Sequence, residues 1–327
     1  VSGVGAATAG DLASSMNQSF PELLRDRSEA ERQQWARWVL GSHSDQFLPE
    51  MVAAVEKLDQ QDPIAYGKPI LNPGPKADDL LVITTEQGKH CIVFDQPLPC
   101  RVVLLDFTGQ GFEAGCNPHG FEEISQACEG MGDAMNVVWK HLEMPPEEHY
   151  ISVLCDDVML RASDICTILA LARLHKLSSV QPSVALNHEL SREYGFLRQR
   201  PCVSMHRVPI VEVMAPFIRR DLWDLIMPFN RGIGSAYGID RFAIPLCAAH
   251  LNAWRFASVD LCPMTHIRRG RTIEKRYRNG LLSKEEELLV RQRLMLAMGE
   301  NIDQTTYDRL VQRASQIDTN TPINSHA

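Results

Sequence analysis

The chain has 327 residues, of which 44% are hydrophobic and 23% are charged, and its formal net charge at pH 7 is −8. These values predict a globular protein with one large domain or two. The negative charge argues against a protein whose whole surface binds nucleic acid. No run reaches the roughly 18 apolar residues of a membrane span. The nine cysteines include no CxxC pair and indicate reduced thiols, so we expect a cytoplasmic protein without a membrane span.

The sequence divides into three predicted parts. Residues 1–72 predict a helical extension, because a capping box at Ser28 precedes apolar residues at helical spacing. A segment rich in proline and glycine then breaks the chain. Residues 78–270 predict an α/β domain, and residues 271–327 predict a second helical extension that ends in a polar tail.

The first half of the α/β domain alternates between predicted strands and helices. Continuous apolar runs predict buried strands at Leu80–Thr84, Arg101–Asp106 and Tyr150–Leu154, since strands covered on both faces lack polar alternation. Apolar residues at spacings of three and four predict an amphipathic helix between Phe121 and Leu142. Ser163 and the residues that follow it predict a capped helix that reaches Lys176.

The second half continues this alternation. Strands are expected at Val208–Met214 and Phe256–Leu261, with a helix at Asp221–Phe229 between them. A later helix is expected to begin at a capping box formed by Ser283 and Glu286. The alternation predicts an α/β fold with a Rossmann-like mixed sheet, flanking helices and a functional site at the carboxyl edge of the sheet.

Two adjacent carboxylates, Asp156 and Asp157, follow the predicted strand that ends at Leu154. Ionised carboxylates in apolar surroundings need a cationic partner. A divalent cation bound to phosphate oxygens is one such partner. We therefore expect Asp156 and Asp157 to hold Mn²⁺ or Mg²⁺ beside a nucleotide diphosphate. The alternative is that they begin a turn and cap the next helix.

His266 lies just beyond the last predicted strand and is the third candidate metal ligand. A neutral imidazole binds Mn²⁺ well and could complete a site begun by carboxylates. A basic run follows it, and the guanidinium groups of Arg268 and Arg269 suit a diphosphate. The alternatives are an ordinary surface or core histidine and a solvated basic segment.

Three further carboxylates are candidate site residues. Asp240 follows a glycine-rich run that begins at Gly232, and it could accept a proton from an acceptor hydroxyl or cap the next helix. Asp106 ends a predicted strand and could bind the base or ribose of a nucleotide. Glu212 stands alone in an apolar run and should have a partner, either substrate or an arginine such as Arg219.

The order of these motifs resembles a group of plant and bacterial glycosyltransferase-like proteins assigned to the GT-A superfamily. The segments that carry the resemblance are Leu80–Thr84, Arg101–Gly109, Tyr150–Asp157, Gln181-Pro182, Val211–Phe217, Tyr237–Asp240 and Val259-Asp260 with His266. They cover about residues 78–267. Tyr237 stands where the group has tryptophan, and the acidic run at Asp156 is shorter than in the group.

The resemblance implies a metal-dependent transfer of a sugar from a nucleotide-diphosphate donor to a hydroxyl. It implies that Thr84 lies under the nucleotide, that Asp157, Asp156 and His266 hold the metal, and that Asp240 is the base. A more distant likeness to a kinetoplastid glucosyltransferase that acts on hydroxymethyluracil in DNA adds a modified DNA base to the acceptors considered, beside a small molecule or a glycan.

Two other functions fit the same sequence. A nucleotidyltransferase that makes sugar nucleotides would need a glycine-rich phosphate loop after the first strand, where this chain has the single glycine Gly88. A non-catalytic nucleotide-binding protein on the same fold would explain the short acidic motif. The donor base, the sugar, the acceptor and the stereochemical outcome are not specified by the sequence.

Overall fold

The computed structural model describes residues 28, 30, 76–186, 195–200, 203–208, 210–228, 233–251, 253, 255–267 and 275–297. The helical extension predicted for residues 1–72 lies outside these residues except for Ser28 and Ala30. The end of the C-terminal extension, from residue 298, lies outside them as well. The domain boundaries predicted from the sequence therefore stay predictions.

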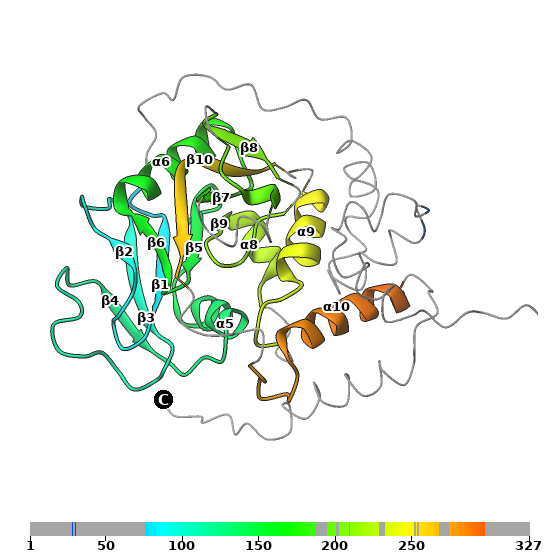
Figure 1. Cartoon of the computed structure of the whole chain (residues 1–327), viewed down its shortest axis with the longest axis horizontal. Coiled ribbons are helices and arrows are strands. Elements are labelled where there is room, and N and C mark those ends of the chain that lie inside the picture. Colours follow the sequence, from blue (N-terminus) through cyan, green and yellow to red (C-terminus); the bar gives the residue numbers. More distant parts are fainter. Residues whose placement is uncertain are drawn as a thin grey trace, which may run out of the picture.

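The described part is a mixed α/β fold built on one sheet (Figure 1). The strands are β1 (Leu80–Thr85), β2 (Ile92–Val93), β3 (Arg101–Asp106), β4 (Glu122–Ser125), β5 (Tyr150–Leu154), β6 (Val158–Arg161), β7 (Ser179–Val184), β8 (Met205–Arg207), β9 (Phe217–Arg219) and β10 (Phe256–His266). Their order is β2-β6-β10-β7-β9-β5-β1-β3-β4, and β8 pairs with β10. The predicted mixed sheet is thus confirmed.

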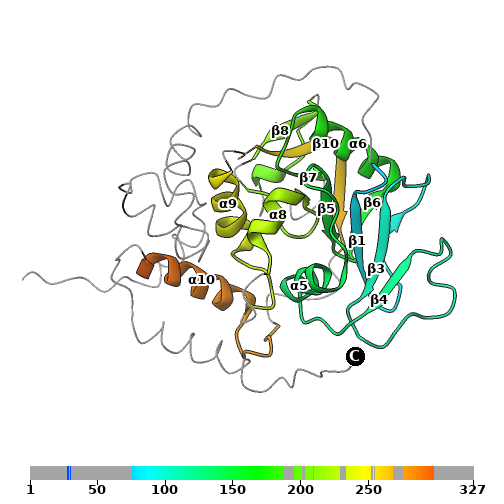
Figure 2. The same ribbon diagram turned by 180° about the vertical axis from the view of Figure 1, so that it is seen from behind.

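The helices are α5 (Met131–His141), α6 (Ala162–Leu174), α8 (Arg220–Ile226), α9 (Ile244–His250), α10 (Ser283–Ala297), the 3₁₀ turn η2 (Gly195–Leu197) and the π-helical turn η3 (Ile239–Ala243). In Figure 1, α10 lies beside α5 and α9, on the opposite side of the molecule from β2, β3 and β4. Figure 2 shows the same arrangement from behind. None of the helices in the described residues is long and apolar enough to cross a membrane.

The centre of the sheet consists of the strands that the sequence predicted as buried. Every residue of β1 and of β5 is buried. β1 pairs in parallel with β3 on one side and with β5 on the other. The antiparallel strand β9 then joins β5 to β7. Because β1, β3 and β5 are parallel, their carboxyl ends meet at one edge, as the sequence predicted.

The helix predicted between Phe121 and Leu142 is correct only in its second half. Residues Glu122–Ser125 form β4 and pair in parallel with β3. The helix α5 begins only at Met131, after Gly130 adopts an extended conformation with φ −168°. Helical spacing of apolar residues therefore continued by chance into a strand, because backbone pairing with β3 overrode it.

The strand predicted at Val208–Met214 is wrong. This segment is buried but irregular. Val208 N still donates to Phe256 O of β10 at 3.2 Å. Two later backbone donors bind side chains, since Glu212 N donates to Gln181 Oε1 at 2.5 Å and Met214 N donates to Glu212 Oε2 at 2.6 Å. The residues after Pro216 form β9 in its place. By contrast, the strand predicted at Phe256–Leu261 exists and extends to His266.

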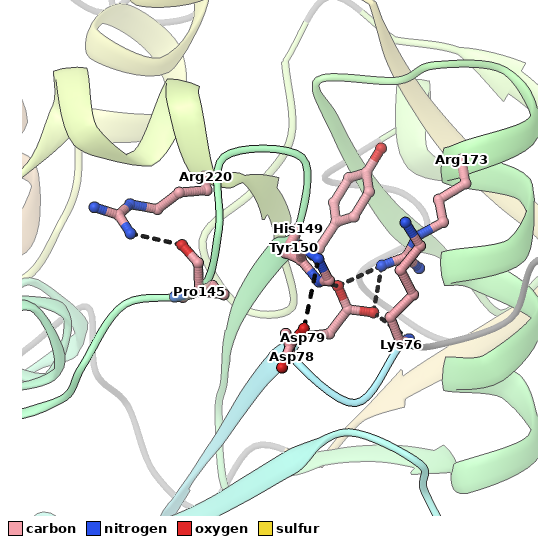
Figure 3. A network of polar contacts seen from close by, with 8 residues as sticks. All are labelled: Lys76, Asp78, Asp79, Pro145, His149, Tyr150, Arg173 and Arg220. Atoms are coloured by element: carbon pink, nitrogen blue, oxygen red, sulfur yellow. Dashed lines mark hydrogen bonds and ion pairs between the residues drawn. The ribbon is translucent and has the colours of Figure 1, made fainter.

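Asp79 connects the beginnings of β1, β5 and the end of α6 (Figure 3). Its carboxylate is buried and accepts hydrogen bonds from Tyr150 N at 3.0 Å and Lys76 N at 2.8 Å. Both carboxylate oxygens also pair with the Arg173 guanidinium, which lies 5.3 Å from the centre of the Tyr150 ring. His149 Nδ1 is 3.3 Å from Asp79 Oδ1. This network fixes α6 to the amino edge of the sheet, opposite the predicted site.

Asp79→Ala should lower the free energy of unfolding by about 3–5 kcal/mol, because it removes the buried carboxylate that pairs with the buried Arg173. Urea unfolding of the two proteins measures this difference. Asp78→Ala is the control, since the Asp78 side chain is 67% exposed, and it should change stability by less than about 0.5 kcal/mol. Equal effects of the two substitutions would contradict the role given to Asp79.

Candidate active site

The candidate site lies where β5, β6 and β10 meet. β5 ends at Leu154, the turn Cys155–Asp157 follows, and β6 begins at Val158. β10 pairs in parallel with β7 over its first residues and antiparallel with β6 over its last, where His266 is opposite Val158. Two segments that are remote in sequence therefore meet at the carboxyl end of β5.

This pairing brings together two of the three predicted metal ligands. His266 Nε2 lies 2.9 Å from Asp157 Oδ1, and both side chains are partly exposed, at 19% and 18%. The backbone fixes the pair, because Ile267 N donates a hydrogen bond to Asp157 O at 2.7 Å. A separation of 2.9 Å fits two neighbouring ligands of one divalent ion with bonds of about 2.1 Å.

Asp156, the third predicted ligand, is in the same turn. Its backbone oxygen accepts a hydrogen bond from Cys91 N at 2.8 Å, which joins the turn to the segment after β1. Among the residues that the structure describes, however, no three His, Cys, Asp or Glu side chains form a group that could hold a metal. The donor set fits an ion that takes its other ligands from phosphate oxygens and water.

Two buried carboxylates belong to the same cluster of charged groups, because Glu212 interacts electrostatically with both His266 and Asp240. Glu212 is 7% exposed and Asp240 is 8% exposed. Burial, together with the negative charge of Asp240, raises the pKa of Glu212 to about 7, although the hydrogen bond from Met214 N and the charges of His266 and Arg241 oppose this shift. Burial also raises the pKa of Asp240, and the nearby charge of Arg241 opposes it. The arrangement therefore contains a carboxylate able to accept a proton near neutral pH.

The glycine-rich run sets the position of Asp240. Gly238 adopts φ +92°, a conformation that side chains disfavour, and the π-helical turn η3 begins directly after it. Asp240 Oδ1 accepts a hydrogen bond from Arg241 N at 2.8 Å. Asp240 lies inside the turn, whose N-cap is Gly238 without a side-chain cap, so the alternative that Asp240 caps the helix is not confirmed. Gly234 connects this run to α5, because its backbone oxygen accepts a hydrogen bond from Gly132 N at 3.0 Å.

The two predicted nucleotide contacts at the first strands have internal partners. Thr84 Oγ1 donates to Leu154 O at 3.0 Å. The Asp106 carboxylate accepts hydrogen bonds from the Thr108 and Ser125 hydroxyls and from the backbone of Gln87, Thr108 and Gly111. Burial alone raises the pKa of Asp106, but these hydrogen bonds lower it to about 2. Both nucleotide contacts stay predictions, and a nucleotide at Asp106 must displace one of these donors.

The remaining predictions about charged residues have different outcomes. Arg219 does not pair with Glu212, because it forms an ion pair with Asp221 at 2.6 Å. Arg268 and Arg269 lie outside the described residues. Asp260 accepts from the buried ring of His206, with 2.7 Å between Oδ2 and Nδ1, and thus has a structural role.

Sequence reasoning missed one residue at the site. Arg241 forms an ion pair with Glu287 of α10, with 2.9 Å between Nη1 and Oε1. No local signal could have found it, because the two residues are far apart in sequence and neither belongs to a recognised motif.

Comparisons with known proteins give a distant likeness in structure only. No protein-family model matches the sequence, and no curated protein matches it significantly. The chain is similar to residues 1–349 of S. aureus TarS in complex with UDP-GlcNAc, with 13% identity, a TM-score of 0.46 and coverage of 73% of each chain. It is also similar to GalNAc-T7 with UDP, GalNAc and Mn²⁺, with 11% identity, a TM-score of 0.38 and coverage of 65% of this chain and 47% of that chain. At these values the likeness carries no argument about activity.

Glu212→Gln should change how stability depends on pH. The pKa of Glu212 is about 7 in the folded chain and about 4.3 in an unfolded one. The folded state thus binds more protons between these values, and stability from this group falls as pH rises through them. Relative to the wild type, the variant should gain stability from pH 5 to pH 8 in urea unfolding. The exposed Glu148→Gln should show no such trend, and a pH-independent difference for Glu212→Gln would contradict the assignment.

Proposed function

We propose that the chain is a metal-dependent glycosyltransferase that moves a sugar from a nucleotide-diphosphate donor to a hydroxyl acceptor. The observation that carries the proposal is the meeting of Asp157 and His266 at 2.9 Å, together with the buried Glu212, which interacts electrostatically with both His266 and the buried Asp240. A cation site next to a proton acceptor is what glycosyl transfer from a diphosphate leaving group requires. The motifs shared with the GT-A superfamily support the same function.

Asp157 and His266 would hold Mn²⁺ or Mg²⁺, with Asp156 close by in the same turn. The ion, when bound, neutralises the charge that develops on the leaving diphosphate. In the proposal, Arg268 and Arg269 bind the diphosphate oxygens, and Thr84, Asp106 and Glu212 lie along the nucleotide sugar. A cytoplasmic setting agrees with the cysteines of the described part, all eight of which are free thiols.

Asp240 would act as the base in a single displacement. Its carboxylate takes the proton of the acceptor hydroxyl, the acceptor oxygen forms a bond to the anomeric carbon, and the bond from that carbon to the diphosphate breaks with its electron pair. The raised pKa of Asp240, caused by burial, makes it a stronger base than an exposed aspartate. The acceptors considered are a small molecule, a glycan and a hydroxymethylated DNA base.

Nucleotide diphosphates and sugar nucleotides with Mn²⁺ should raise the melting temperature when the correct donor is present. Ligand at a hundredfold excess over its dissociation constant stabilises by about 2.7 kcal/mol. Asp157→Asn should abolish the Mn²⁺-dependent part of the shift, because it removes a ligand charge. Asp224→Asn, on the exposed face of α8, should leave the shift intact.

The same panel separates the alternatives. A nucleotide-induced shift that needs no metal and survives Asp157→Asn would favour a non-catalytic nucleotide-binding protein. Pyrophosphate release from a nucleoside triphosphate and a sugar phosphate would favour a nucleotidyltransferase. That alternative has weak structural grounds, because a Cβ at Gly88 would lie 2.4 Å from Cys116 Cβ, so this glycine serves loop packing. If no nucleotide or sugar nucleotide shifts the melting temperature, the proposed site is rejected.

Asp240→Asn should reduce release of nucleoside diphosphate from the donor by at least about 100-fold, since an amide cannot take the proton. The dissociation constant of the donor should stay within about twofold of the wild type, because the metal pair at Asp157 is intact. Steady-state rates and the melting-temperature titration measure the two quantities. Unchanged turnover in this variant would remove Asp240 as the base.

A further inference from the structure

The helix α10 contacts both ends of the segment that carries Asp240. Two consecutive glutamates make these contacts. Glu286 is 0% exposed, and its carboxylate accepts hydrogen bonds from Gly234 N at 3.1 Å and Ser235 N at 2.9 Å. The sequence predicted Glu286 as a capping partner of Ser283, and the structure corrects this, since its oxygens bind the glycine-rich run.

The second contact reaches the residue next to the candidate base. Glu287 is 7% exposed and pairs through Oε1 with Arg241 Nη1 at 2.9 Å. Arg241 N in turn donates to Asp240 Oδ1 at 2.8 Å. The segment 233–241 is therefore held by Glu286 near its beginning and by Glu287 at its end, and Gly238, with φ +92°, lies between them.

Hydrogen bonds join the segment that leads into α10 to the residue Glu129 and to α10 itself. Asn279 Nδ2 donates to Glu286 Oε1 at 2.6 Å, and Tyr277 is 7% exposed. Arg278 N donates to Glu129 Oε2 at 2.8 Å, and Lys275 Nζ contacts Glu129 O. Glu129 lies two residues before α5, which is beside α10 in Figures 1 and 2. These hydrogen bonds connect the start of α10 to the segment before α5.

We propose that α10 is a positioning element of the active site, in which Glu286 and Glu287 hold segment 233–241 so that Asp240 stays in place for proton transfer. This inference rests on the proposed function, because it assumes that Asp240 is the base. It assigns the C-terminal helix, which the sequence treated as an accessory extension, to the catalytic half of the site and not to the donor half at Asp157 and His266.

Charged and titratable groups from different elements surround Asp240. Arg241 belongs to its own turn, Glu212 to the segment after β8, Tyr237 to the glycine-rich run and Glu287 to α10. Glu287 is negative when ionised and it also shares the charge of Arg241. Its replacement by glutamine removes a negative charge near Asp240 and the ion pair of Glu287 with Arg241, which favours the Asp240 carboxylate and lowers the pKa of this base.

The test compares Glu287→Gln with Glu285→Gln in the full chain. Glu285 is on the same helix, but its carboxylate accepts Leu282 N at 2.9 Å and does not contact segment 233–241 in the described structure. With the sugar nucleotide identified by the panel, Glu287→Gln should reduce nucleoside diphosphate release by about 10- to 100-fold, because a small displacement of a catalytic group has effects of this size. The donor dissociation constant should change by less than about twofold, and the acid limb of kcat against pH should move to lower pH.

Glu287→Asp provides a second check, since it keeps the charge and should recover part of the turnover and most of the wild-type pH profile. A Glu287→Gln variant with the turnover and pH profile of Glu285→Gln would overturn the inference. So would a parallel loss of donor affinity, because α10 would then only support the fold. In either case an active wild type leaves the proposed function standing, whereas a wild type that neither binds nor turns over any donor removes both.

Discussion

The candidate site depends on the strand pairing of β10. This single strand pairs with β7 at its beginning and with β6 at its end, and the register shifts between Val259 and Met264. The shift carries the end of the strand from the main sheet to the short strand that follows Asp157. Because side chains alternate between the two faces of a strand, a slip of one residue would turn His266 away from Asp157. The pairing of β10 therefore decides whether a carboxylate and an imidazole can share a cation.

The buried carboxylates at the two edges of the sheet have different partners. At the amino edge, Asp79 meets a guanidinium and two backbone donors, which suits a permanent structural role. At the carboxyl edge, burial raises the pKa of both Glu212 and Asp240, and Arg241 is divided between Asp240 and Glu287. An incompletely neutralised group of this kind is unfavourable for stability but useful for proton transfer. The two edges thus divide stability and chemistry between them.

The sequence predicted the elements whose apolar pattern was unambiguous. The strands around Val82, Val103 and Val153 appear as expected, because no other structure buries a continuous apolar run of this length so well. It failed at Ile124, where pairing with β3 overrode helical spacing, and at Glu212, whose segment is buried without regular structure. In both places, contacts with residues distant in sequence determine the backbone conformation. The local sequence pattern does not show these contacts.

The sequence by itself determined the mixed α/β class and the residue types at the carboxyl edge, including Asp157, His266 and Asp240. It did so because strand burial and strand-end acids are local properties. Only the tertiary structure decided that Asp157 and His266 meet and that the Asp106 carboxylate accepts hydrogen bonds from within the protein. It also decided that Glu286 and Glu287 contact the segment that carries Asp240. These outcomes depend on strand register and helix docking, which are set by the sum of many contacts across the fold and not by any neighbouring residues.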